Sequence, residues 1–325
     1  MKIFVAGGAG YIGSYLVPVL MAHGYDVHVD DLLWFGNYLP PDVHLATKDL
    51  FECTSKDFEG YEQVIFLAGL SNDPMAEFSP AKNFIYNAAL PAYLALVAKQ
   101  AGVRRFIHAS SCSVYGYAVN QLYDEEAPTT CTYPYGISKL QGERGVHHFQ
   151  DDAYSVISLR QGTVSGFSPR MRLDLIVNTM FKSAMTERQI VINNPSIWRP
   201  VFSISDVAVA FLRAIQADYS LSGVFNVASE NCTVGHVGDL VKTEFERLTG
   251  DSIGLTIGNV QDFRNYKVSI DKARTELGFQ PSATLKDIVE DLFAHRELFS
   301  DFGDDRYYNI KVFRKLEEQP HSPTE

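Results

Sequence analysis

The sequence predicts an α/β protein built on a doubly wound parallel sheet. Short apolar runs of strand type alternate with helical segments through the first half of the chain. Each step from one strand to the next passes through a helix, and such crossovers join parallel strands. Residues 63–67 form an apolar run that suits a strand covered on both faces. A glycine-rich turn between the first strand and the first helix is the third observation.

This turn follows a strand predicted at residues 2–6. Gly7 permits the tight turn, Gly10 lets the backbone approach a pyrophosphate, and Gly13 allows the next helix to pack on the strand. The helix N-terminus adds free N–H groups and the positive end of a helix dipole. The pattern predicts a Rossmann-type dinucleotide site, although a turn that merely needs small residues is an alternative.

A second strand, predicted at residues 26–30, ends in an acid at the place where an adenosine ribose would lie. Asp30 follows the glycines by about twenty residues, as a βαβ dinucleotide unit requires. Its carboxylate is expected to accept the ribose hydroxyls and to repel a 2′-phosphate, which favours NAD over NADP. The loop that begins with Asp31 and Leu32 can wall the adenosine pocket or pack on the sheet edge.

The remaining elements are predicted in the same way. Strands are expected at 44–47, 63–67, 105–109, 155–160, 190–192 and 224–227, and helices at 83–100, 135–149, 171–185, 206–217, 236–249 and 284–298. The regular alternation of strand and helix patterns becomes less clear after Gly162. We therefore expect an NAD-binding Rossmann domain of residues 1–162, to which 200–217 return, a substrate-binding lobe of 163–315, and a disordered tail of 316–325.

Composition excludes several classes of partner. The formal charge of −11 argues against a nucleic-acid surface, which needs a basic stripe. No apolar run is long enough to cross a membrane, and the N-terminus is a strand rather than a signal sequence. We expect a cytoplasmic protein with no membrane partner. Its cysteines are scattered, so neither a metal site nor a disulfide is predicted: Cys53, Cys112, Cys131 and Cys232.

The strongest chemical motif is Tyr135-x-x-x-Lys139. Residues four apart share one face of a helix, so the phenol and the ammonium lie side by side. A nearby cation favours the phenolate, and we expect it to lower the pKa of Tyr135 from about 10 toward the working range. The motif is common by chance, and its position in this chain gives it weight, because it follows a serine-rich strand end at Ser110-Ser111-Cys112-Ser113.

Together these motifs resemble the extended short-chain dehydrogenase/reductase family, and within it the NAD-dependent nucleotide-sugar epimerases and dehydratases. The resemblance covers nearly the whole chain, from the glycine turn to Ile270-Asp271-Lys272-Ala273. It implies that Tyr135 is the acid/base, that Lys139 binds the nicotinamide ribose, and that Ser111 hydrogen-bonds the reacting hydroxyl or ketone. NAD is the cofactor that it implies.

The resemblance also assigns residues around the two ligands. Around the cofactor it places Gly7, Gly10, Tyr11, Ile12, Gly13, Asp30, Asp31, Leu32, Asp49, Leu50, Ala68, Gly69, Leu70, Asn87, Ser110, Tyr135 and Lys139. Around the substrate we expect Ser111, Cys112, Ser113, Thr163, Arg172, Arg199 and Arg264. Arg199 resembles the arginine that grips the substrate diphosphate, and a surface salt bridge is its alternative. Arg170, Arg172 and Arg264 can contact a diphosphate or a sugar, or pair with carboxylates.

Two departures from the family pattern affect the expected reaction. The dehydratases carry Asp-Glu after the catalytic Ser or Thr, whereas this chain has Cys112 and Ser113, which disfavours loss of water. Thr163 replaces an asparagine of many relatives, which weakens a phosphate contact there.

The resemblance implies epimerisation of a nucleoside-diphosphate sugar through a 4-keto intermediate. A reductase of 4-keto deoxysugars would use the same residues once and is the alternative. A non-catalytic dinucleotide sensor is disfavoured, because the chain keeps Ser111, Tyr135 and Lys139 together. Helices 83–100 and 135–149 carry apolar residues on more than one side, as in the four-helix interface of the family, so a homodimer is expected.

Overall fold

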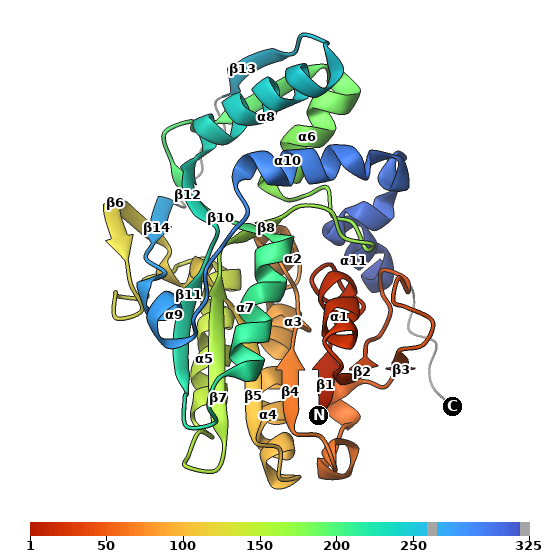
Figure 1. Cartoon of the computed structure of the whole chain (residues 1–325), viewed down its shortest axis with the longest axis vertical. Helices are drawn as coiled ribbons and strands as arrows, with labels where there is room; N and C mark the ends of the chain where they lie inside the picture. The colour runs from red at the N-terminus through yellow and green to blue at the C-terminus, as the bar shows by residue number, and fades with distance from the viewer. Residues whose placement is uncertain (259–264, 319–325) are drawn as a thin grey trace.

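A seven-stranded parallel sheet forms the centre of the computed structural model, which describes residues 1–258 and 265–318 (Figure 1). The strand order is β11-β7-β5-β4-β1-β2-β3, and every neighbouring pair is parallel. The strands are β1 (Lys2–Ala6), β2 (Asp26–Asp30), β3 (His44–Ala46), β4 (Gln63–Phe66), β5 (Arg105–Ser111), β7 (Ser155–Gln161) and β11 (Gly223–Val227). The predicted α/β fold class is confirmed.

Alternate residues of each strand enter two separate cores, because side chains of a strand point to opposite faces. In β1, Ile3 and Val5 pack with α1 (Gly13–Ala22) and α7 (Ile204–Gln216). Phe4 and Ala6 pack on the other face, where α4 (Leu90–Gln100) and α5 (Pro134–His147) lie. Both faces of the sheet are therefore covered, as in Figure 1.

The C-terminal half contributes to both parts of the molecule. Strand β11 forms an edge of the large sheet, and α7 lies beside α1. A small lobe, at the top of Figure 1, contains α6 (Ile176–Glu187), α8 (Val234–Thr249), α10 (Leu285–Ala294), β9 (Gln189–Asn193) and β13 (Gly254–Gly258). The predicted division into a domain of 1–162 and a lobe of 163–315 stays a prediction.

Several short elements surround the carboxyl ends of the central strands. One small sheet joins β12 (Glu230–Thr233), β10 (Trp198–Ser203) and β8 (Thr163–Ser165), and another joins β14 (Asn265–Val268) to β6 (Tyr117–Tyr123). The short helices are α2 (Asp73–Phe78), α3 (Pro80–Phe84) and α9 (Asp271–Glu276), with 3-10 turns at Leu50–Glu52, Ser55–Phe58, Cys112–Tyr115, Arg296–Phe299 and Asp305–Tyr307. Most of these elements are too short to produce a recognisable hydrophobic pattern in the sequence.

The predicted helix at 83–100 is interrupted. A π-helical turn, Ile85–Ala89, separates α3 from α4. Pro91 has no N–H to donate to the carbonyl of Asn87, four residues earlier, so the regular helical ladder fails there. The interruption gives Asn87 a place at the inner surface of the helix, where it is fully buried.

Two other helix predictions need correction. The helix predicted at 171–185 begins only at Ile176, because Arg172 pairs with Asp174 and the Leu173 amide donates to the Tyr307 carbonyl at 2.9 Å. An unpredicted helix, α11 (Asn309–Glu318), includes residues 316–318 of the expected tail. No helix within 1–258 and 265–318 combines the length and the apolar character of a membrane-spanning segment.

Candidate active site

The turn between β1 and α1 has the shape that a dinucleotide phosphate needs. Gly7 has a φ of 77°, and a Cβ built on it would lie 2.5 Å from the backbone nitrogen of Ala68. A Cβ on Gly13 would lie 2.2 Å from the carbonyl oxygen of Gly8, because α1 begins close against the turn. A Cβ on Gly10 would meet no neighbouring atom closer than 3.5 Å, and this residue lines a cavity. The N-terminus of α1 is thus open to an anion.

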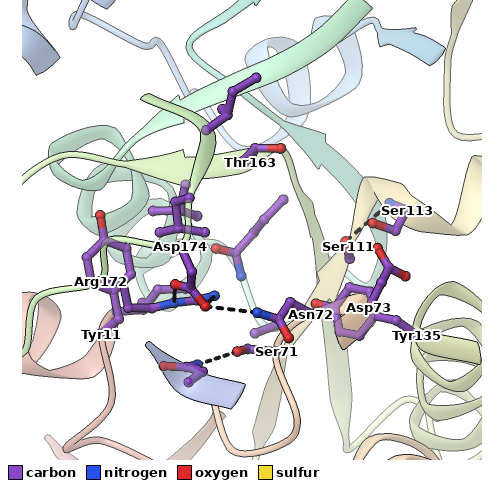
Figure 2. A pocket seen from close by; sticks show the side chains of 18 of the residues that line it. Tyr11, Ser71, Asn72, Asp73, Ser111, Ser113, Tyr135, Thr163, Arg172 and Asp174 are labelled. Carbon is purple, nitrogen blue, oxygen red and sulfur yellow. Dashed lines mark hydrogen bonds and ion pairs between the residues drawn. The ribbon is translucent and has the colours of Figure 1, made fainter. Parts of the chain in front are cut away.

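A cavity of about 560 Å³ extends from this turn across the carboxyl ends of the central strands (Figure 2). Of the predicted site residues, those that line it are Gly7, Gly10, Tyr11, Ile12, Gly13, Ala68, Gly69, Leu70, Ser110, Ser111, Ser113, Tyr135, Lys139, Thr163, Arg172 and Arg199. Those outside its lining are Asp30, Asp31, Leu32, Asp49, Leu50, Asn87 and Cys112. Arg264 lies outside the described residues.

The two acids at the end of β2 point to different surroundings. The Asp31 carboxylate accepts the backbone N–H of Ala9 at 2.9 Å and that of Leu33 at 2.8 Å, so it lies against the glycine turn. The Asp30 carboxylate accepts the Lys48 N–H at 2.9 Å instead. Sequence spacing assigned the ribose contact to Asp30, but neighbouring strand residues face opposite ways, and the contacts favour Asp31.

Asn87 supports the cavity wall rather than lining it. Its side-chain oxygen accepts the Leu70 N–H at 2.9 Å, and its amide donates to the Leu70 carbonyl at 2.9 Å. This paired contact fixes the loop after β4, where Gly69 has a φ of 133°. A Cβ on Gly69 would lie 2.3 Å from the Asn87 side-chain oxygen, so the close approach requires glycine.

Tyr135 is partly buried and lines the cavity, with Ser111 and Asp73 around its phenol (Figure 2). Burial and the negative charge of Asp73 raise the pKa of Tyr135 to about 12, against the hydrogen bond from Ser111 and the positive charge of Arg172. The predicted lowering of this pKa by Lys139 is therefore wrong. Helical spacing indicated a neighbour of opposite charge but contained no information about burial or about Asp73.

Lys139 lies one turn further along α5 and is 6% exposed. Burial lowers its pKa to about 8, partly offset by Glu143 in the next turn. Glu143 accepts the Ser110 hydroxyl at 2.6 Å and forms a buried ion pair with Arg160 at 2.7 Å. Ser110 thus joins the end of β5 to α5, which holds Ser111 and Tyr135 in register.

Cys112 does not face the cavity, contrary to its predicted place around the substrate. Its thiol is fully buried and donates to the Arg160 carbonyl oxygen at 3.1 Å. Burial raises the pKa of this thiol, so it stays protonated. Ser113 lines the cavity, and its backbone N–H donates to the Ser111 hydroxyl at 3.1 Å. The position after Ser111 therefore holds no acid or base that a substrate can reach.

Charged and aromatic side chains line the opposite wall. Arg172 binds both oxygens of Asp174, at 2.8 and 3.1 Å, and the Asn72 amide donates to the same carboxylate at 2.9 Å (Figure 2). Arg199 is 7% exposed and lies with its guanidinium 5.7 Å from the centroid of the Tyr266 ring. This wall can hold a charged and aromatic ligand next to the Tyr135 phenol.

The sequence matches the model of the NAD dependent epimerase/dehydratase family over residues 3–228. The chain belongs to this family. The resemblance inferred from the motifs is thereby confirmed, and NAD is the cofactor of the family. The glycine turn, open at Gly10 and at the start of α1, fits a dinucleotide pyrophosphate.

Curated relatives match the epimerase/dehydratase chain over most of its length. The UDP-glucose 4-epimerase of Corynebacterium glutamicum is 26% identical over 324 residues, which cover 93% of this chain and 97% of that protein. The UDP-glucose 4-epimerase of Lacticaseibacillus casei is 27% identical, with 87% and 92% covered. The solved structure of MoeE5 with UDP-glucuronic acid and NAD has a TM-score of 0.78 at 25% identity and covers 97% of this chain and 100% of its own.

A further solved structure supports the fold alone. The UDP-glucuronic acid 4-epimerase of Bacillus cereus has a TM-score of 0.81 at 23% identity, and the match covers 92% of this chain and 100% of that chain.

Sequence reasoning missed several residues that line the cavity of this family member. They are Ser71, Asn72, Asp73, Asp174, Tyr266 and Asn309. The polar run after Leu70 was an available signal, because ligands of doubly wound sheets bind at the carboxyl ends of the strands. Nothing in the sequence pattern indicated that Asn309, in the unpredicted helix α11, returns to the site.

Proposed function

We propose that this chain is an NAD-dependent nucleoside-diphosphate-sugar 4-epimerase that works through a 4-keto intermediate. The observation that supports it best is that Ser111, Tyr135 and Lys139 line the same cavity as the glycine turn. A hydroxyl pair and an ammonium next to a dinucleotide site suit proton transfer at a sugar carbon. The relatives named UDP-glucose 4-epimerase match nearly their whole length, which supports a UDP-hexose as substrate.

In this proposal Tyr135 moves the proton at the sugar O4. Its phenolate, which Ser111 and Arg172 favour against burial and Asp73, takes the hydroxyl proton, and its phenol later returns a proton to the 4-keto oxygen. The chemistry supplied by bound NAD is reversible hydride transfer at C4. Ser111, whose hydroxyl favours the phenolate of the neighbouring Tyr135, orients the sugar oxygen. Epimerisation requires the keto sugar to present its opposite face, so the cavity must let the hexose turn.

Other residues hold the ligands. Lys139 binds the nicotinamide ribose, and Asp31 accepts the hydroxyls of the adenosine ribose. Arg199 binds the substrate diphosphate, with Tyr266 beside it. The family resemblance supplies the roles of Lys139 and Arg199, and the contacts of Asp31 with the glycine turn support its role.

Two other reactions use the same fold. A 4-keto-sugar reductase would use Tyr135 once and exchange its cofactor after each turnover. A dehydratase would need an acid and a base after Ser111, and the buried Cys112 thiol disfavours it. We favour epimerisation because the relatives matched over most of their length carry that name.

We also propose that the chain forms a homodimer through α4 and α5. These helices lie side by side, and a Cβ on Gly145 would lie 2.9 Å from the Cβ of Ala92. The family resemblance predicts that this helix pair meets its copy across a two-fold axis. Light scattering at micromolar concentration should give twice the chain mass, and a strictly monomeric mass would contradict the proposal.

The test of the proposed reaction is conversion of a sugar without added cofactor. Purified protein is incubated with UDP-glucose, UDP-N-acetylglucosamine and the GDP-, CDP- and dTDP-hexoses, and products are identified by NMR. We expect one of these sugars to equilibrate with its C4 epimer. Stoichiometric consumption of added NADH with a 4-keto sugar, and no epimer from any hexose, would instead identify a reductase.

A further inference from the structure

Arg170 is fixed beside the phosphate-binding end of α1. The Ser168 hydroxyl donates to the carbonyl oxygen of Tyr11 at 2.7 Å and lies 2.9 Å from the Ser14 hydroxyl. The backbone N–H of Arg170 donates to the same Ser14 hydroxyl at 3.2 Å. The loop after β8 is therefore attached to the glycine turn, and Arg170 has its backbone at the start of α1.

The Arg170 side chain is a buried cation that lines the cavity, and no carboxylate of residues 1–258 and 265–318 forms an ion pair with it. It is 2% exposed, and its Nε has no hydrogen-bond partner among the described residues. Its guanidinium stacks on the Phe35 ring, 3.8 Å from the centroid. Of the other buried arginines, Arg160 and Arg172 each form an ion pair, and Arg105 donates to the Ser155 hydroxyl and to four backbone carbonyls. A buried, unpaired charge is costly, so such a group indicates an anionic ligand.

We propose that the Arg170 guanidinium binds the pyrophosphate of the dinucleotide and that α11 holds it in place through Asn309. The α1 N-terminus and the open side of Gly10 favour the same anion from the opposite side. A 2′-phosphate is the other phosphate a dinucleotide can offer, and the Asp31 carboxylate beside the glycine turn disfavours it. The proposal rests on NAD binding in this cavity, not on the identity of the sugar reaction.

Asn309 connects Arg170 to the far side of the cavity. Its side-chain oxygen accepts Nη2 of Arg170 at 2.5 Å, and its amide donates to the Ser71 hydroxyl at 2.6 Å (Figure 2, at Ser71). The Arg306 carbonyl, just before α11, accepts the same Nη2 at 3.4 Å. A continuous chain of hydrogen bonds thus spans from the loop after β4 to the loop after β8.

Helix α11 is itself anchored on both sides of the cofactor groove. Phe313 is fully buried and stacks on Trp34, with ring centroids 5.8 Å apart, and meets Phe78 of α2 at 6.0 Å. Lys82 forms an ion pair with Glu317 at 2.5 Å. Release of a dinucleotide held by Arg170 therefore requires these contacts to loosen, and we expect NAD to leave slowly, as an epimerase that regenerates its cofactor needs.

Binding measurements test this proposal independently of turnover. Protein freed of nucleotide is titrated by calorimetry with NAD, NADP, ADP-ribose and adenosine. Arg170→Met removes the positive charge, and Arg170→Lys keeps the charge on a shorter side chain. Asn309→Ala removes the hydrogen bond that holds the guanidinium. Arg314→Met is the matched control, because it removes an exposed arginine from the same helix as Asn309. Thermal unfolding of each nucleotide-free variant checks the fold.

We expect Arg170→Met to weaken NAD and ADP-ribose by about 10- to 100-fold, the usual effect of losing a charged hydrogen bond, and to leave adenosine within about twofold. The NAD affinity of Arg170→Lys should fall between those of Arg170→Met and the parent, that of Arg314→Met should match the parent, and Asn309→Ala should release labelled NAD faster in a chase. If Arg170→Met weakened the binding of adenosine as much as that of NAD, Arg170 would support the shape of the site and not bind phosphate. If Arg170→Met weakened the binding of NADP alone, Arg170 would contact the 2′-phosphate instead. Unchanged affinity for NAD would contradict a contact between Arg170 and the pyrophosphate. If NAD binds as predicted but no sugar is epimerised, the proposed function fails and this inference stands.

Discussion

Asp73 and Tyr135 lie side by side in the cavity, and the negative charge of Asp73 adds to burial in raising the pKa of the phenol (Figure 2). Asp73 is the first residue of α2, whose start is fixed because Asn72 accepts the Met75 N–H at 3.1 Å. Asp73 favours the protonated phenol of Tyr135, whereas Ser111 and Arg172 favour its phenolate. The balance between them sets the pH at which Tyr135 can accept a proton.

Asp73→Asn should therefore lower the pKa of Tyr135. Removal of the negative charge favours the phenolate, so the inflection in the pH dependence of kcat/KM should move to lower pH. Glu77→Gln is the matched control, because it removes an exposed carboxylate from the same helix. An inflection that stays in place, or moves upward, would show that Asp73 does not act on Tyr135.

Cofactor choice should depend on Asp31 more than on Asp30. The parent protein should bind NAD roughly tenfold or more tightly than NADP, because a carboxylate at the ribose repels a 2′-phosphate. Asp31→Ala should narrow this ratio, whereas Asp30→Asn should leave it near the parent value. Titration of both cofactors measures the ratios. A larger effect at Asp30 would restore the assignment made from sequence spacing.

Asp30 should instead affect stability as a function of pH. Burial raises its pKa from 3.8 to about 6, so the folded state holds the proton more tightly than the unfolded state. The free energy of unfolding that it contributes is fully present below pH 3.8 and is lost as the pH rises through 6. Asp30→Asn, which resembles the protonated form, should unfold at a higher temperature than the parent at pH 7 and lose this advantage toward pH 4. Parallel curves for the two proteins across this range would contradict the account.

The protein should not dehydrate its substrate. Ser111 is followed by a buried thiol where a dehydratase has an acid, and Cys112 donates its proton to the Arg160 carbonyl. Mass spectrometry after incubation with UDP-, GDP-, CDP- and dTDP-hexoses should find no product lighter by one water. Such a product would mean that another acid, with Asp73 the first candidate, replaces the missing pair.

Sequence reasoning succeeded where a pattern is local and failed where packing decides. The bounds of β1 and β2 agree with the prediction, because an apolar run between turn residues defines a strand without help from the rest of the chain. The glycine turn was found for the same reason. Residues of the loops around Ser71 and Arg170 meet only in the folded chain, through Asn309 of α11, and no periodicity connects them.

The pKa of Tyr135 illustrates the same limit. The four-residue spacing to Lys139 follows from the helix, but burial and the approach of Asp73 are properties of the folded cavity. Asp30 and Asp31 show the same limit of sequence reasoning for two adjacent residues. Spacing placed an acid at the end of β2, and only the direction of each side chain separates the residue that contacts the glycine turn from the one that contacts Lys48.

The most direct test of the proposed mechanism is turnover by Tyr135→Phe with the substrate identified for the parent protein. The substitution removes one oxygen from a ring that still packs, so NAD affinity and the unfolding temperature should stay at the parent values. The rate should fall by roughly two to four orders of magnitude, the usual contribution of a positioned acid/base. Turnover at the parent rate would contradict the assignment of Tyr135 as the proton-transfer group.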